Sequence, residues 1–240
     1  HERWILMALA LYVHGGIYSF FGNALHELSH FTVFKSKWLS RLMINVYGWF
    51  LWPYNPYLYR ASHFFFHHRY TLYQGSDGED APGYFAVTPK DIFFAFTRIF
   101  RFKNLVRSLY RLFTLTPTSV GWRNRTMKLD PWEIFIMQRA SEKDRQRIHR
   151  FAVFSLVSHL AFAAICIATG HWFLIVLITL APFYGPTILG LLCGPHQHAC
   201  CEANCPDFKK SCGSATLDPI LSFLYWRMEN HTEHHMYPAM

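Results

Sequence analysis

Two long apolar segments separated by only two residues constrain the fold of this chain more than any other feature. Phe151–Thr169 and Trp172–Cys193 contain no Asp, Glu, Lys or Arg, and only Gly170 and His171 lie between them. A helix of about 20 apolar residues crosses the hydrocarbon core of a bilayer. The pattern therefore predicts two membrane spans joined by a tight turn. That turn carries no Lys or Arg, which is typical of the outer side of a membrane.

Three further segments fit a membrane protein. Residues 4–25 are apolar enough for another span, and Gly15, Gly16 and Gly22 would allow close helix contacts. Residues 39–59 have an apolar core too short to span and are broken by prolines, which indicates a re-entrant segment. Residues 85–113 mix phenylalanines with arginines, which predicts helices lying in the membrane interface.

The composition agrees with a single integral-membrane domain over residues 1–240. Hydrophobic residues make up 52% of the chain and charged residues 16%, whereas soluble domains have about 25% charged residues. The net charge is +8, and 14 of the 23 Lys and Arg residues lie between Lys90 and Arg150. We interpret this basic stretch as a cytoplasmic loop that obeys the positive-inside rule, and we expect no nucleic-acid partner.

Histidines gather in three boxes, each close to an apolar segment. The boxes are H-x-x-x-H at His26 and His30, H-x-x-x-H-H from His63, and H-x-x-H-H from His231. Residues three and four apart share one face of a helix, and neutral imidazole is a common metal ligand. One zinc ion needs three or four ligands, so eight or nine histidines predict two metal ions. Iron, copper, zinc and nickel all accept imidazole ligands. Eight or nine histidines gathered at a bilayer surface indicate redox chemistry.

The order of these motifs resembles the membrane fatty acid desaturase and hydroxylase superfamily. The likeness rests on H-E-L-S-H, H-F-F-F-H-H-R-Y-T, Q-H-A and H-T-E-H-H-M-Y-P, and it extends over nearly the whole chain. The resemblance implies an all-α, multi-pass transmembrane helical bundle with a cytoplasmic cap that holds the boxes. It also implies a non-haem di-iron centre, O2 as co-substrate, a lipid or acyl-chain substrate, and ferredoxin or cytochrome b5 with its reductase as the electron donor.

Matched motif by motif, the resemblance assigns nine metal ligands: His26, His30, His63, His67, His68, His198, His231, His234 and His235. His196 has no clear counterpart in the family and is a weaker candidate ligand. Metal-bound histidines usually donate their other N–H to a carboxylate or carbonyl, so Glu27, Asp218 and Glu233 are candidate hydrogen-bond partners.

The sequence departs from the family pattern at two places. The second box has three residues between its first two histidines where many members have two, and Glu229-Asn230 replace an expected Asn-Tyr pair. These differences concern the lipid subfamily and not the metal centre. We expect desaturation of an aliphatic chain, with hydroxylation as the alternative outcome.

Two other functions fit part of the pattern. His26-Glu27-x-x-His30 is also the H-E-x-x-H motif of zinc metalloproteases, but that function leaves the other two boxes unexplained. A metal carrier or sensor would predict histidines spread along the spans. Cys200, Cys201, Cys205 and Cys212 with His196 offer a separate zinc site as a further possibility. His14 and His159, inside the spans, are expected to be structural.

Overall fold

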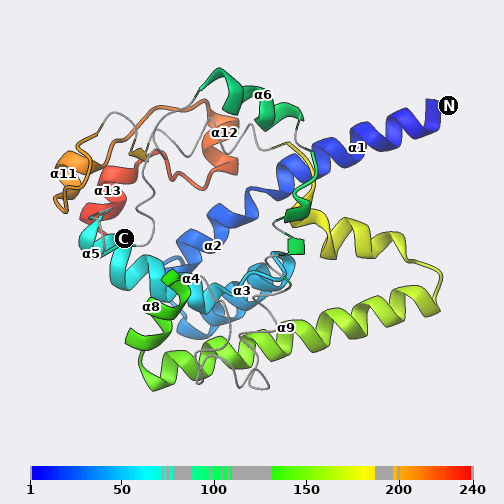
Figure 1. Cartoon of the computed structure of the whole chain (residues 1–240), viewed down its shortest axis with the longest axis horizontal. Helices are drawn as coiled ribbons and strands as arrows, with labels where there is room; N and C mark the ends of the chain where they lie inside the picture. Colours follow the sequence, from blue (N-terminus) through cyan, green and yellow to red (C-terminus); the bar gives the residue numbers. More distant parts are fainter. Residues whose placement is uncertain are drawn as a thin grey trace.

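The structure is a computed structural model, and it describes residues 2–71, 73, 76–77, 88–97, 99–103, 105–106, 109, 131–186, 197–198 and 201–238. Over these residues the chain is helical, and its one β-type pairing is an isolated bridge between Phe100 and Tyr184. The α-helices are α1 (Glu2–Tyr18), α2 (Phe21–Ser29), α3 (Lys37–Phe50), α4 (Pro56–Ser62), α5 (His68–Tyr70), α6 (Pro89–Thr97), α8 (Pro131–Arg139), α9 (Glu142–Ala168), α11 (Phe208–Ser211), α12 (Pro219–Leu224) and α13 (His231–Met236). The structure also has two π-helices, η1 (His63–His67) and η3 (Ile175–Thr179), and the 3-10 helix η4 (Ala181–Phe183) (Figure 1).

Two helical stretches are long and apolar enough to cross a membrane. One runs over Arg3–Ser29 and joins α1 to α2, and the other is α9. The predicted spans 4–25 and 151–169 fall on these stretches. The side chains of Trp4, Leu6 and Leu160 are more than 60% exposed, so much of this apolar surface is not packed against other described parts of the chain. Such a surface suits a lipid environment.

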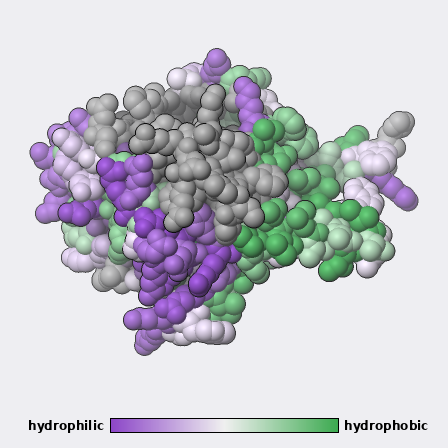
Figure 2. Space-filling model, turned by 60° about the horizontal axis from the view of Figure 1, so that its bottom comes forward, coloured by the Kyte–Doolittle hydropathy of each residue, from purple (hydrophilic) through white to green (hydrophobic). Residues whose placement is uncertain are grey.

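The apolar surface gathers at one end of the molecule. Figure 2 shows hydrophobic residues over the right-hand end of the molecule, where two arms project, and hydrophilic residues over the lower and left-hand parts. In Figure 1 the free part of α1 and the C-terminal part of α9 point toward that same end. The helices that carry the histidine boxes, α2, α5 and α13, lie toward the opposite end.

The described part of the predicted span 172–193 does not form one continuous helix. The helical backbone ends at Thr179, and a 3-10 turn over Ala181–Phe183 follows. Pro182 removes a backbone donor from this turn, and Gly185 then adopts φ +87°. An added Cβ on Gly185 would lie 2.6 Å from Gly15 Cα, so the chain turns here to pack its backbone against α1. Residues 187–193 of the predicted span lie outside the described residues.

Residues 37–62 form a helix–turn–helix that begins and ends beside the first histidine box. Helix α3 starts at the Ser36 cap, and α4 starts at Pro56, where the Asn55 side chain accepts hydrogen bonds from two backbone N–H groups. The chain leaves along α3 and returns along α4, because the rings of His30 and His63 meet at 5.4 Å between centroids. The segment 39–59, for which the sequence predicts a re-entrant path, therefore consists of two helices joined by a turn.

Part of the predicted interfacial segment 85–113 is visible as α6. Ile92, Phe93 and Phe96 on this helix are 44–61% exposed, and Phe100 and Phe102 after it are more exposed still. Residues 85–87 and most of 104–113 lie outside the described residues.

The packed core lies between these helices, next to the boxes. Leu25 and Leu28 on α2 and Ile44 on α3 are almost fully buried together. Because the two leucines flank His26 on α2, this contact fixes the face that α2 presents to the metal centre. A second cluster packs Trp52 and Met137 against Ile148 of α9.

Candidate metal centre

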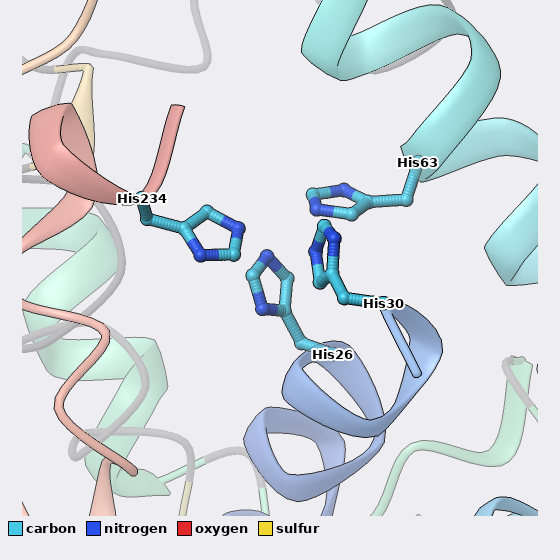
Figure 3. A group of neighbouring side chains, drawn as sticks. All are labelled: His26, His30, His63 and His234. Carbon is cyan, nitrogen blue, oxygen red and sulfur yellow. The ribbon is translucent and has the colours of Figure 1, made fainter. Parts of the chain in front are cut away.

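Eight histidines form two compact groups of possible metal ligands in the described part of the chain. Site A contains His26, His30, His63 and His234, and site B contains His67, His198, His231 and His235. Within each group, one nitrogen of every ring lies within 4.8 Å of the others. Figure 3 shows the four rings of site A pointing toward one another from three different parts of the chain.

The first box supplies site A from one helix. His26 and His30 lie one turn apart at the C-terminal end of α2, and their ring centroids are 5.5 Å apart. Both are nearly fully buried, with exposed fractions of 4% and 6%. The apolar contact of α2 with α3 therefore holds two ligands on one side of site A.

The second box divides between the two sites because its backbone is a π-helix. The segment η1 covers His63–His67, and the N–H of His68 donates to the carbonyl of His63, five residues earlier. A π-turn widens the helix and is common at functional sites. His63 faces site A and His67 faces site B. The extra residue in this box, one of the two departures from the family pattern, is accommodated by this wider turn.

The third box also divides between the two sites. In α13, His231 and His235 contribute to site B while His234 contributes to site A. The Nε2 atoms of His231 and His235 are 3.1 Å apart. Because boxes two and three both supply each site, sites A and B are held side by side by two short helices.

His68 is the one assigned ligand outside the two groups, and it lies at the side of site A. Its Nε2 is 3.0 Å from Nε2 of His63 and 3.1 Å from Nε2 of His234. Its ring also lies 4.5 Å, centroid to centroid, from His235 of site B. Site A therefore has five imidazoles within reach and site B has four.

Two carboxylates and one backbone carbonyl fix the orientation of ligand histidines, each by a contact with the Nδ1 atom of the ring. Asp77 Oδ2 lies 2.7 Å from Nδ1 of His67, and both side chains are buried. Glu27 Oε1 lies 2.9 Å from Nδ1 of His26 and 3.7 Å from Nδ1 of His234. His198 donates from Nδ1 to the carbonyl of Ser211 at 2.8 Å. Such bonds select the tautomer that leaves Nε2 free for a metal.

Burial keeps the ligand rings neutral. Burial, together with the neighbouring imidazoles, lowers the pKa of His30 to about 3 and that of His234 to about 4. The pKa values of His63, His68, His231 and His235 are also far below their ordinary value, chiefly because of burial. Neutral imidazole is the form that binds a metal.

The donor set fits two cations. Metal–nitrogen bonds of about 2.1 Å place ligands on opposite sides of an ion roughly 4.2 Å apart, which agrees with nitrogens that all lie within 4.8 Å of one another. Nitrogen-only ligands suit iron, copper or zinc better than calcium or magnesium. Nε2 atoms that converge at 3.0–3.1 Å are arranged as ligands of a shared ion are.

Two acids predicted as hydrogen-bond partners of the ligands have other roles. The exposed Asp218 caps α12 by accepting from the N–H groups of Ile220 and Leu221. The exposed Glu233 accepts a hydrogen bond from the Ser214 hydroxyl. The Asp218 carboxylate thus forms a helix N-cap and the Glu233 carboxylate makes a surface contact, and in the described part of the chain Glu27 is the one of the three acids that contacts ligands.

Asp77 was not singled out by the sequence, which shows it only as one of several acids in a polar loop. Asp77 follows His67 by ten residues, and this separation does not match a helix or strand periodicity that would bring the two side chains together. Glu229 is likewise buried, with an exposed fraction of 5%, and hydrogen-bonds the Ser222 hydroxyl.

The alternative zinc site with cysteines is tested only in part. His196 and Cys200 lie outside the described residues, and neither group of candidate ligands found in the described residues includes a cysteine. Burial raises the pKa of the Cys212 thiol to about 12, so this thiol stays protonated at neutral pH. His14 bonds Tyr184, and His159 contacts Thr179 and the Trp49 carbonyl; both are part of the helix packing.

Comparison with known proteins agrees with this geometry. The family model described as fatty acid desaturase matches residues 2–240. No curated protein and no solved structure gives a significant match.

Proposed function

The chain belongs to the fatty acid desaturase family, and we propose that it is an O2-dependent, membrane-bound di-iron oxidoreductase that desaturates an aliphatic chain of the fatty acyl or lipid-like kind. The observation that carries the proposal is the division of the histidines into two adjacent sites, with boxes two and three supplying both. A protein that bound one structural metal would need only one such group.

In this proposal, site A and His68 hold one iron ion and site B holds the other. Two ferrous ions at these sites would supply the electrons and the Lewis acidity for reducing O2 to an oxidant that takes hydrogen from an unactivated C–H bond.

The protein's own residues then have three tasks. The imidazoles would bind the metal through Nε2 in their neutral form, which their lowered pKa values favour. Glu27 and Asp77 hold the rings of His26 and His67 in one orientation. The near-complete burial of His63, His67 and His231, each at most 2% exposed, keeps bulk water away from the metal side of these rings.

Hydroxylation is the second candidate, because it uses the same ligands. The two outcomes differ in how the substrate lies against the centre. Product analysis by mass spectrometry separates them: loss of two hydrogens is expected, and a gain of one oxygen would assign the hydroxylase instead.

The metalloprotease alternative fits the geometry less well. His26 and His30 complete a group of four imidazoles with His63 and His234, whereas a catalytic zinc ion keeps one position open for water. The Glu27 carboxylate also lies against Nδ1 of His26, where it orients a ligand, and the general base of a zinc protease has to reach the metal-bound water.

The partners and location of the enzyme belong to the same proposal. The basic residues of Lys90–Arg150 would face the cytoplasm and attract an acidic electron donor, ferredoxin or cytochrome b5 with its reductase. The C-terminal end of Arg3–Ser29 and the N-terminal end of α9 lie toward the side of the molecule that holds the boxes (Figure 1). This supports an active site on one face of the membrane, which we place on the cytoplasmic side.

Replacing one box histidine tests the assignment against a histidine outside the boxes. His234→Ala removes a ligand that contacts His26, His30 and His68, so turnover should be lost and about one iron per chain should disappear. His149→Ala, on α9, should keep both iron and turnover. Equal loss of iron in the two variants would contradict the assignment.

A further inference from the structure

A cavity between α3 and α9 lies away from the histidines. It has a volume of about 580 Å³ and is lined by Leu42, Asn45, Val46, Trp49, Tyr57, Arg147, Arg150, Phe151 and Phe154. We call it the α3–α9 groove. Its volume is in the range of small-molecule sites. None of the box histidines lines it, so it is separate from sites A and B.

Two helical stripes facing each other build the groove. Positions 42, 45, 46 and 49 form one face of α3, and positions 147, 150, 151 and 154 form one face of α9, because residues three and four apart share a helix face. The two helices run in the same direction here. Trp49 near the end of α3 donates to Ser158 on α9 at 2.9 Å, and an added Cβ on Gly48 would lie 3.0 Å from the Phe151 ring.

The groove has a basic end and an apolar end. Arg147 and Arg150 lie on the last turns of the charged part of α9, and Phe151 and Phe154 begin the apolar part. On α3 the apolar end is completed by Val46 and Trp49. Among the described residues, no Asp or Glu lines the groove. Asp144, one turn earlier on α9, pairs with Arg147 at 3.3 Å.

The guanidinium group of Arg150 is available to bind an anion. Its side chain is exposed, and it forms no hydrogen bond or ion pair within the described part of the chain. A guanidinium group binds a phosphate through two parallel N–H···O bonds. Arg41, one turn before Asn45, adds a further exposed positive charge near this end.

The change from basic to apolar also marks a depth in the bilayer. Phe151–Ala168 contains no Asp, Glu, Lys or Arg, and its length of about 27 Å matches the hydrocarbon thickness. Arg150 would therefore lie at the level of the lipid headgroups. Leu42, Val46 and Phe154 at the rim are 37–52% exposed, so the groove is open on the side where lipid would be.

We propose that the α3–α9 groove binds one anionic phospholipid of the surrounding bilayer, with the phosphate on Arg147 and Arg150 and one acyl chain along Val46, Trp49 and Phe154. The lipid is a bound partner and not the substrate, because no box histidine lines the groove. Its position joins α3, α4 and α9, and α4 leads directly into the second histidine box. This inference does not depend on the proposed function.

Trp49 allows the binding to be measured directly. The full chain in neutral detergent micelles is titrated with phosphatidylglycerol or phosphatidylcholine that carry brominated acyl chains, which quench tryptophan on contact. The chain has 8 tryptophans, so the difference between wild type and Trp49→Phe isolates the signal of Trp49. Phosphatidylglycerol should quench this signal at a mole fraction at least fivefold lower than phosphatidylcholine, about fivefold for each arginine that contributes.

Arginine variants locate the headgroup. Arg147→Gln/Arg150→Gln should bring the phosphatidylglycerol midpoint to that of phosphatidylcholine. Arg145→Gln is the matched control, because Arg145 lies on the same helix outside the groove and pairs with Glu142 at 2.8 Å; it should keep the wild-type preference. Equal quenching by the two lipids, or an equal effect of Arg145→Gln, overturns the proposal. So does full competition by glycerol phosphate, which would mean that an anion alone fills the site.

A second measurement avoids replacing a packed tryptophan. Native mass spectrometry of wild type and Arg150→Gln counts phosphatidylglycerol molecules retained per chain. Arg150 is exposed and has no ion-pair partner among the described residues, so its replacement should leave the helix packing unchanged. One retained lipid in wild type and none in Arg150→Gln supports the site, and equal retention contradicts it.

Discussion

The metal centre consists of histidines that can bind a metal and of acidic side chains that orient some of these histidines. Box histidines could be predicted from the sequence because their spacing of three and four residues reports a shared helix face. Glu27, within the first box, could also be predicted as an orienting acid, whereas Asp77 could not, because a hydrogen bond from a loop leaves no periodic signal. Asp77, in a polar loop, contacts His67, whereas Asp218, at the start of α12, and Glu233, within the third box, are exposed.

Asp77→Asn should weaken metal binding without removing a ligand. The carboxylate accepts from Nδ1 of His67 and is buried beside it, so an amide in its place loses the charge that strengthens this bond. Replacing such an outer partner typically lowers metal affinity about 10- to 100-fold. Competition with a chelator, followed by metal analysis, measures the change.

The control for this experiment is Glu233→Gln. Glu233 is an acid within the third box, but its carboxylate contacts Ser214 on the surface. The metal affinity of the Glu233→Gln variant should remain within about twofold of wild type. If the two variants lost metal equally, the role of Asp77 would be disproved.

Helices and turns follow the sequence pattern wherever hydrophobic periodicity or a proline determines them. The break of residues 39–59 by prolines and the apolar run of α9 were both predicted from the sequence. Two features were not. The π-helix at His63–His67 has no sequence signature apart from the extra residue in the box. The end of the helix before Pro182 depends on a backbone contact with Gly15, which is more than 160 residues away.

Gly15→Ala tests this contact between α1 and the η4 turn. An added Cβ would lie 2.5 Å from the Tyr184 carbonyl and 2.8 Å from Gly185 Cα, and backbone atoms cannot easily move aside. Overpacking of this kind costs about 1–3 kcal/mol. Thermal unfolding in detergent should therefore begin at a lower temperature than in wild type.

Gly22→Ala provides the comparison on the adjacent helix. Nothing lies within 4 Å of a Cβ at Gly22, and alanine favours a helix over glycine by about 0.5–1 kcal/mol. Its unfolding temperature should equal or exceed that of wild type. A lower value for Gly22→Ala than for Gly15→Ala would show that α1 does not pack as described.

The whole molecule has a polar end with the metal sites and an apolar end with the candidate spans. The sequence indicated an apolar part of this kind, because the chain has 16% charged residues and contains long segments without charge. The way in which the three boxes meet was implied by the family resemblance and by their number. Their division into sites A and B depends on tertiary contacts, and spacing alone does not determine it.

The concentration of positive charge predicts that an electron donor docks electrostatically. If the donor is acidic, turnover with donor and reductase should fall steeply as ionic strength rises from about 0.05 to 0.3 M, because the Debye length shortens to less than 10 Å. Turnover driven by a small uncharged reductant serves as the control and should change little. The same salt dependence for both reductants would rule out docking through the basic stretch.

The most direct test of the two-site centre is elemental analysis of the purified, detergent-solubilised chain after anaerobic reconstitution with ferrous iron. Nine imidazoles in two groups predict about two irons per chain, and this count should fall in His63→Ala and in His231→Ala, which remove one ligand from each site. One zinc ion and no iron would contradict the account and favour the H-E-x-x-H protease.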